Sequence, residues 1–98
     1  MLMMAVHQTP SLTQERYEEV VRRLTGGKRP ESPTDFPFDG LLVHLAGSGK
    51  NGFYVVDVWE SREAAERFGE LIGPIAREVG IEEPADFFPA HTVISAAR

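Results

Sequence analysis

Two neighbouring segments, residues 40–46 and 53–59, are largely apolar on both of the faces that a β-strand would present. Successive side chains of a strand point to opposite sides of the sheet, so a strand with one wet face alternates apolar and polar residues. In the first segment, alternation places Leu41, Val43 and Leu45 on one face, and Leu42, His44 and Ala46 on the other. In the second segment, it places Tyr54, Val56 and Val58 on one face, and Phe53, Val55, Asp57 and Trp59 on the other. With Asn51-Gly52 supplying left-handed backbone for a turn, the two segments predict a hairpin buried on both faces.

Capping residues and hydrophobic spacing predict two helices, one on each side of this hairpin in the sequence. Thr13 is a good N-cap for the first helix, which Gly26-Gly27 ends. Ser61 caps the second helix, and Gly80 is the expected left-handed residue after its last turn. Both helices carry apolar residues at the spacing of one buried stripe, which predicts that each packs against the sheet.

Two more strands complete the predicted sheet. Residues 3–8 form a short strand, and residues 87–97 form the last one, whose start Pro89 places at a sheet edge. The resulting order β-α-β-β-α-β is the ferredoxin-like topology. The predicted fold class is therefore α+β, with a four-stranded antiparallel sheet and two helices on one face.

Two helices can cover one face of such a sheet, whereas the hairpin predicts that both faces are buried. The chain has 98 residues, and we expect one domain over residues 1–98. A domain of this size buries only about 60% of its unfolded surface, and it has no cysteine from which to form a disulfide. We therefore expect a homodimer in which the second face packs on another copy of the chain.

The chain is acidic, with 15 acidic and 10 basic residues and a formal net charge of −5. The nearest approach to a basic cluster, Lys28-Arg29, is followed by Glu31. These features argue against nucleic acid and anionic membrane surfaces as partners. Residues 1–6 lack a basic residue and are too short an apolar run for a signal or membrane segment. We therefore expect a cytoplasmic protein.

Two stretches and one helical residue carry a family resemblance. The stretches are Asp-Gly-Leu-Leu-Val-His at residues 39–44 and Val-Asp-Val-Trp-Glu-Ser at residues 56–61, and the second runs into the helix that contains Phe68. Together they resemble the dimeric α+β barrel superfamily, in particular its antibiotic-biosynthesis-monooxygenase-like branch. The resemblance implies paired ferredoxin-like domains and a ligand cavity lined by aromatic or histidine side chains near Phe68. The superfamily includes cofactor-free monooxygenases, haem-degrading enzymes, polyketide cyclases and isomerases. Phe68 stands where haem-degrading members often have His or Trp, which argues against haem.

The residues predicted to carry acid–base chemistry are His44 and Asp57. Any register of a short hairpin pairs even positions of the first strand with odd positions of the second, so both side chains share a face. Asp57 would orient His44 and strengthen it as a general base. The pair could remove a proton from an acidic phenol or β-diketone, and the resulting carbanion could meet oxygen or close a ring without a cofactor. The alternative is that the two side chains only satisfy each other's hydrogen bonds.

Five further side chains are expected to line the substrate cavity: Tyr17, Phe36, Trp59, Phe68 and His91. For Trp59 the alternative is a packing role at the strand end. Phe36 belongs to the irregular segment 25–39, which is longer than most connections. Its aromatic residues either cap the cavity as a lid or plug the core or the dimer seam.

The expected function is that of a cofactor-independent monooxygenase or cyclase-type enzyme acting on an aromatic or polyketide-like small molecule. The alternatives are a non-catalytic small-molecule-binding or accessory protein on the same fold and, third, a purely structural dimer. The sequence has no Ser-His-Asp order, phosphate loop or dinucleotide fingerprint. Its histidines lack the paired spacing of metal ligands, so no metal is expected.

Overall fold

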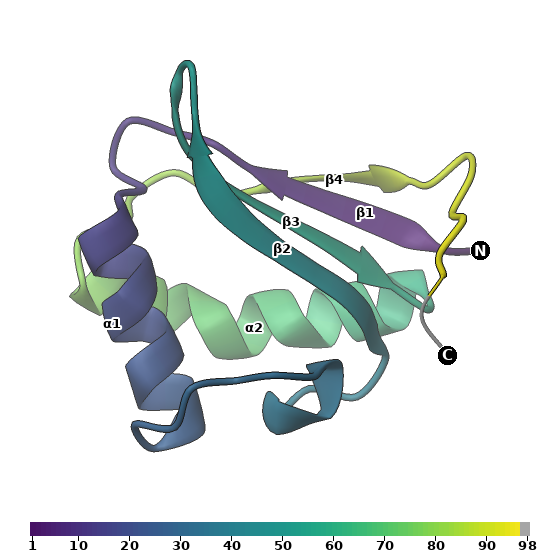
Figure 1. Ribbon diagram of the computed structural model, residues 1–98, viewed down its shortest axis with the longest axis horizontal. Coiled ribbons are helices and arrows are strands. Elements are labelled where there is room, and N and C mark those ends of the chain that lie inside the picture. Colours follow the sequence, from purple (N-terminus) through teal and green to yellow (C-terminus); the bar gives the residue numbers. More distant parts are fainter. Residues whose placement is uncertain (97–98) are drawn as a thin grey trace.

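The computed structural model describes residues 1–96 and gives the elements in the order β-α-β-β-α-β, with a 3₁₀ turn before the second strand (Figure 1). The elements are β1 (Met3–His7), α1 (Gln14–Thr25), η1 (Pro33–Asp35), β2 (Leu41–Gly49), β3 (Gly52–Trp59), α2 (Arg62–Glu78) and β4 (Asp86–Pro89). Each strand pairs antiparallel with its neighbours in the sheet order β2-β3-β1-β4. The predicted ferredoxin-like α+β class is confirmed.

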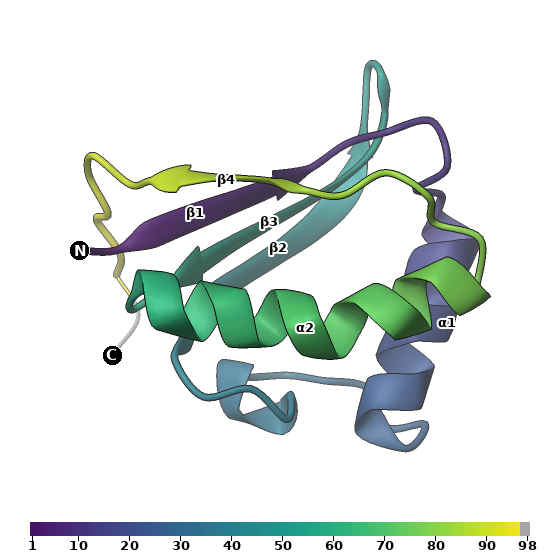
Figure 2. The same cartoon turned by 180° about the vertical axis from the view of Figure 1, so that it is seen from behind.

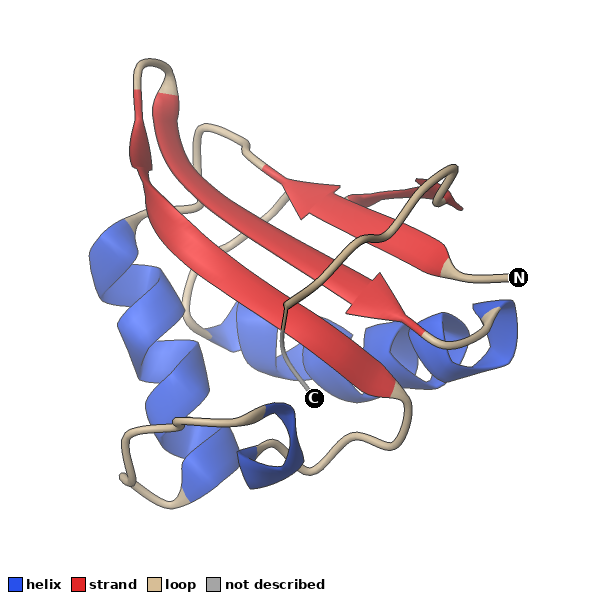
Figure 3. Cartoon of the chain, turned by 45° about the vertical axis from the view of Figure 1, so that its right-hand side comes forward, coloured by secondary structure: helices blue, strands red, loops and turns tan. Residues whose placement is uncertain are grey.

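Both helices lie on one side of the sheet, as the two opposite views show (Figures 1 and 2). The other side carries no helix, and in Figure 3 the chain that follows β4 passes in front of it. In that segment the side chain of Ile94 does not pack on the sheet, because it is 91% exposed. Within residues 1–96, no helix is long and apolar enough to span a membrane.

The predicted helix boundaries are confirmed by their caps. The hydroxyl of Thr13 accepts a hydrogen bond from the Arg16 N–H at 3.2 Å, which satisfies one free donor of the first turn of α1. Ser61 does the same for the Ala64 N–H at the start of α2, at 3.1 Å. The first helix ends at Gly26, whose φ of 67° is left-handed backbone that glycine adopts without steric cost.

The core lies between the sheet and the helices and divides into two clusters. The buried residues of the first cluster are Met3, Ala5, Phe36, Leu41, Trp59, Ala64 and Ala65. Those of the second cluster are Leu12, Val20, Phe53 and Ile81. The indole of Trp59 is fully buried, and the first cluster forms around this side chain. The clusters anchor β1, β3 and both helices, and thereby fix how α1 faces the sheet.

A β-bulge corrects the predicted faces at the start of β2. Leu41 lies opposite Trp59 and Val43 lies opposite Val58, so Leu42 is an extra residue in the ladder. Leu41 therefore points to the helix side and is buried, whereas strict alternation placed it on the same face as Val43. Leu42 is 43% exposed as a result.

Two other predictions about the strands are wrong in part. The last strand ends at Pro89, which lies opposite Met3 at the start of β1 and has no N–H for the ladder. One more backbone hydrogen bond follows, from the Ala90 N–H to the Leu2 carbonyl at 2.9 Å. Residues 90–96 form no strand, and residue 97 lies outside the described residues. The hairpin turn is also tighter than predicted: β2 and β3 continue to Gly49 and Gly52, and no non-glycine residue described, Asn51 included, has a positive φ.

Candidate functional site

Three side chains from α1, β2 and β3 form one hydrogen-bonded line. The Nδ1 atom of His44 lies 2.6 Å from Oδ1 of Asp57, and its Nε2 atom lies 2.6 Å from the hydroxyl oxygen of Tyr17. The predicted contact between His44 and Asp57 is confirmed. The predicted catalytic roles of these two residues stay predictions, because a contact alone does not show chemistry.

The strand register explains this geometry. His44 lies directly opposite Asp57 in the β2–β3 ladder, and Ala5 of β1 lies opposite Asp57 on its other side. A directly opposite pair brings two side chains of one face within reach of each other. Asp57 is only 5% exposed, and its carboxylate has His44 as its hydrogen-bond partner within residues 1–96. The line therefore lies on the helix side of the sheet.

The hydrogen bonds assign a direction to this line. An ionised carboxylate only accepts, so Nδ1 of His44 donates to Asp57. In the neutral tautomer that carries this proton, Nε2 is an acceptor and the O–H of Tyr17 donates to it. The order is that of Ser-His-Asp sites, with a tyrosine hydroxyl in place of the serine.

Tyr17 stays protonated to unusually high pH. Burial raises the pKa of its phenol above the ordinary value of 10.0, and the negative charges of Asp57 and Glu18 raise this pKa further. Tyr17 is therefore a hydrogen-bond donor throughout the neutral range. The group in place to take up its proton is Nε2 of His44, 2.6 Å away.

Aromatic rings enclose the line. The Phe36 ring lies 5.0 Å from the His44 ring, and the Phe53 ring lies 5.1 Å from Tyr17, measured between ring centroids. Behind them Phe68 packs against Trp59, with 4.7 Å between their centroids. Phe36 belongs to the buried core, which favours the plug over the lid for its segment. Trp59 is wholly buried, and its indole N–H has no hydrogen-bond partner within residues 1–96.

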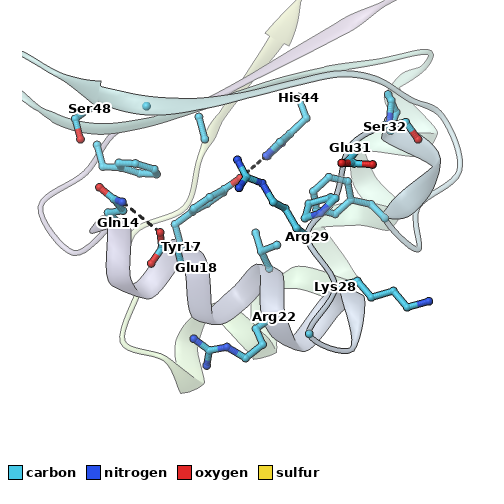
Figure 4. Close-up of a pocket in the computed structure, with 18 residues that line it drawn as sticks. Gln14, Tyr17, Glu18, Arg22, Lys28, Arg29, Glu31, Ser32, His44 and Ser48 are labelled. Carbon is cyan, nitrogen blue, oxygen red and sulfur yellow. Dashed lines mark hydrogen bonds between the residues drawn. The ribbon is translucent and has the colours of Figure 1, made fainter.

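Two cavities meet at the Tyr17–His44 hydrogen bond. The inner one, of about 370 Å³, lies between the sheet and the helices and is lined mainly by apolar side chains, Trp59 and Phe68 among them. The outer one, of about 830 Å³, opens between α1, β2 and the loop after α1 (Figure 4). Both cavities are lined by Tyr17, Val21, Phe36 and His44. The phenol and the imidazole therefore border both cavities.

One predicted site residue does not join the cluster. His91 lies in the irregular segment after β4, is exposed, and hydrogen-bonds the Thr92 hydroxyl at 2.7 Å. Another histidine, His7, is held by the backbone carbonyl of Glu83 at 2.8 Å. Among the described residues, no three His, Cys, Asp or Glu side chains converge as a metal site would require.

Sequence reasoning missed two features of the site. It assigned Tyr17 to the cavity wall, whereas the hydroxyl completes the line through His44. The available signal was a phenol on the apolar stripe of α1, where a buried hydroxyl needs a partner. The second feature is the pair Lys28 and Arg29, which lines the outer cavity with basic groups.

Comparisons of the chain with protein-family models, with curated proteins and with solved structures found no match. The fold is ferredoxin-like by its topology. Its site is the hydrogen-bonded line of Tyr17, His44 and Asp57.

Proposed function

We propose that the chain is a cofactor-independent enzyme of the monooxygenase or cyclase type, which removes a proton from an acidic aromatic or polyketide-like small molecule. The observation that carries this proposal is the hydrogen-bonded line from Tyr17 through His44 to Asp57 at the junction of two cavities. A purely structural pair would need only His44 and Asp57. Here the line continues to a hydroxyl that borders both ligand-sized spaces.

Proton transfer follows the direction of the hydrogen bonds. The acidic C–H or O–H of the ligand gives its proton to the oxygen of Tyr17, while the Tyr17 proton passes to Nε2 of His44. Asp57 stabilises the imidazolium that forms, because its buried carboxylate lies 2.6 Å from Nδ1. Tyr17 ends this step protonated, with the proton taken from the ligand, and the extra proton lies on His44. The imidazolium gives that proton up as the carbanion is reprotonated or as water or the ring-closed alkoxide forms, which restores the resting site.

The carbanion then has two outcomes. It can reduce molecular oxygen and take up one oxygen atom, while the second oxygen atom leaves as water. It can instead attack a carbonyl group of the same molecule and close a ring. The aromatic walls of the inner cavity suit a flat, delocalised anion of either kind.

Proton abstraction is measurable with anthrone, a flat ketone with an acidic CH₂ group. In deuterium oxide under nitrogen, we expect the chain to accelerate exchange of these protons above the buffer rate, followed by NMR. His44→Ala should reduce this acceleration by about 10²–10⁴-fold, the usual contribution of a positioned base. His91→Ala, which changes an exposed histidine outside the site, should retain it. In air, the monooxygenase outcome converts anthrone and O₂ to anthraquinone and water.

The exchange assay also separates the two readings of the site. If the wild-type chain binds anthrone but leaves exchange at the buffer rate, the proposed enzyme is contradicted. A non-catalytic small-molecule-binding protein would then describe the cavities better. Equal exchange rates in the wild-type and His44→Ala chains would contradict the role of His44 directly.

We also propose that the chain forms a homodimer through the sheet face opposite the helices. This face carries apolar side chains, including Leu45, which is 59% exposed, and no helix covers it (Figure 3). Its other apolar members are half-buried, namely Met4, Val6, Val43, Tyr54 and Val56, except for Val58, which is already buried. An apolar patch of this kind usually marks an interface. Sedimentation at micromolar concentration should give twice the mass of one chain, and a monomer mass would overturn the proposal.

A further inference from the structure

The rim of the outer cavity is richer in basic groups than the chain as a whole. The chain has a net charge of −5, yet this cavity is lined by Arg22, Lys28 and Arg29 against only Glu18 and Glu31. Basic side chains that gather at one cavity of an acidic protein indicate a site for an anion if they are not already paired with acidic side chains.

The three basic groups differ in what they contact. Arg22 forms an ion pair with Glu19, one turn away on α1. Lys28 lies close enough to Asp35 to lower the pKa of that carboxyl, although two backbone N–H groups contribute more to this shift. Arg29 has no ion pair or side-chain hydrogen bond within residues 1–96. The Lys28 ammonium has no ion pair or side-chain hydrogen bond within residues 1–96 either, but in Figure 4 it extends away from Tyr17 and His44. Arg29 is therefore the unpaired basic group on the side of this rim that faces the pair.

The backbone directs Arg29 over the cavity. Gly26 and Gly27 both have left-handed φ values, 67° and 93°, so the chain reverses direction as α1 ends. Pro30 restricts the residue before it to extended backbone. In Figure 4 the side chain of Arg29 extends toward the Tyr17–His44 pair, and all three residues line the outer cavity.

The chemistry of the rim favours a single negative charge on the ligand. A guanidinium binds a carboxylate through two parallel hydrogen bonds, and it can stack on a ring at the same time. The rim includes the carboxyl end of α1, where the helix dipole disfavours anions, and it disfavours a doubly charged phosphate more than a singly charged carboxylate. Asp57 and Glu18 add negative charge near Tyr17, so an anion would need Arg29 to offset their repulsion.

We propose that Arg29 selects ligands that carry a carboxylate next to an aromatic ring, with the carboxylate on the guanidinium and the ring against Tyr17 and His44. This inference rests on the proposed function for its choice of site, and it adds the class of substrate. The reacting C–H or O–H group then lies beside the carboxylate-bearing position of the ring, within reach of the Tyr17 hydroxyl.

Two matched probes test the inference by calorimetric titration of the full chain: 1-hydroxy-2-naphthoate and its neutral amide. The acid should bind the wild-type chain about 10-fold more tightly than the amide, the difference expected for one charge-assisted pair. Arg29→Gln should reduce this ratio to near one and leave the affinity for the amide unchanged. Arg22→Gln is the matched control, because Arg22 lines the same cavity but is already paired, and it should keep the ratio.

Three results would overturn the inference: equal affinity of acid and amide for the wild-type chain, a ratio that survives in Arg29→Gln, or no binding of either probe at millimolar concentration. Tighter binding of 1-naphthyl phosphate than of the naphthoate would also contradict the inference, because it would show that the rim selects a phosphate group rather than a carboxylate. Failure of the proposed function gives a different result, because the acid-to-amide ratio would persist while anthrone exchange stayed at the buffer rate.

Discussion

Replacing Trp59 with alanine should lower the free energy of unfolding by about 3–5 kcal/mol, the largest loss expected from a single side chain in this protein. The indole is fully buried and contacts the rings of Phe38 and Phe68, with centroid distances of 5.9 and 4.7 Å. Alanine would leave a cavity at the centre of the first core cluster, which the backbone of β3 cannot fill. Urea unfolding followed by circular dichroism measures the loss.

Leu71→Ala is the control for this measurement, since Leu71 is an apolar residue of α2 that is 46% exposed. We expect it to change stability by less than about 0.5 kcal/mol. If the Trp59→Ala chain does not fold, the loss of stability can be measured on Trp59→Phe instead. It should lose less than alanine, because it retains a ring and removes the buried N–H that has no partner. Equal losses for Trp59→Ala and Leu71→Ala would contradict the central place of Trp59.

Gly40→Ala should be the second most damaging change, at about 2–4 kcal/mol. Gly40 precedes β2 with a φ of 88°, and left-handed backbone costs other residues about 1–2 kcal/mol. A Cβ atom there would lie 2.7 Å from the Cβ of Ala64, so α2 or the strand would have to shift. The carbonyl of Gly40 also accepts the N–H of Glu60 at 2.8 Å, which ties the start of β2 to the end of β3.

Gly26→Ala separates the two causes of that loss. Gly26 is left-handed as well, with a φ of 67°, but a Cβ atom there would have no neighbour within 4 Å. It should therefore lose only the backbone contribution, about 1–2 kcal/mol. Thermal unfolding of both variants gives the comparison. If the two variants lose the same stability, the contact with Ala64 contributes nothing. That result would contradict the close packing of α2 against the start of β2.

Local signals explain how much of the fold could be predicted from the sequence. The caps Thr13 and Ser61 act within one turn of their own helices, and strand alternation acts within one strand, so both could be predicted without tertiary information. The contact between His44 and Asp57 followed from the same alternation, because a short turn fixes which positions share a face.

The features that the sequence did not reveal depend on how distant elements meet. The bulge at Leu42 depends on how the strand twists over Trp59, and no residue type in β2 marks it. Tyr17 reaches His44 only because α1 crosses the sheet at one angle and height, which the packing of both core clusters decides. The direction of Arg29 depends on the irregular path after α1, where no periodic pattern exists.

Removing one oxygen atom tests the proton path most directly. Tyr17→Phe keeps the ring against Phe53 and His44 but deletes the hydroxyl that connects His44 to the cavities. Residues that act as a unit in catalysis cost nearly the same when removed singly. In the anthrone exchange assay, Tyr17→Phe should therefore lose as much activity as His44→Ala, at least about 10²-fold, with unchanged affinity for anthrone. A Tyr17→Phe chain that exchanges at the wild-type rate, beside an inactive His44→Ala chain, would contradict transfer through the tyrosine.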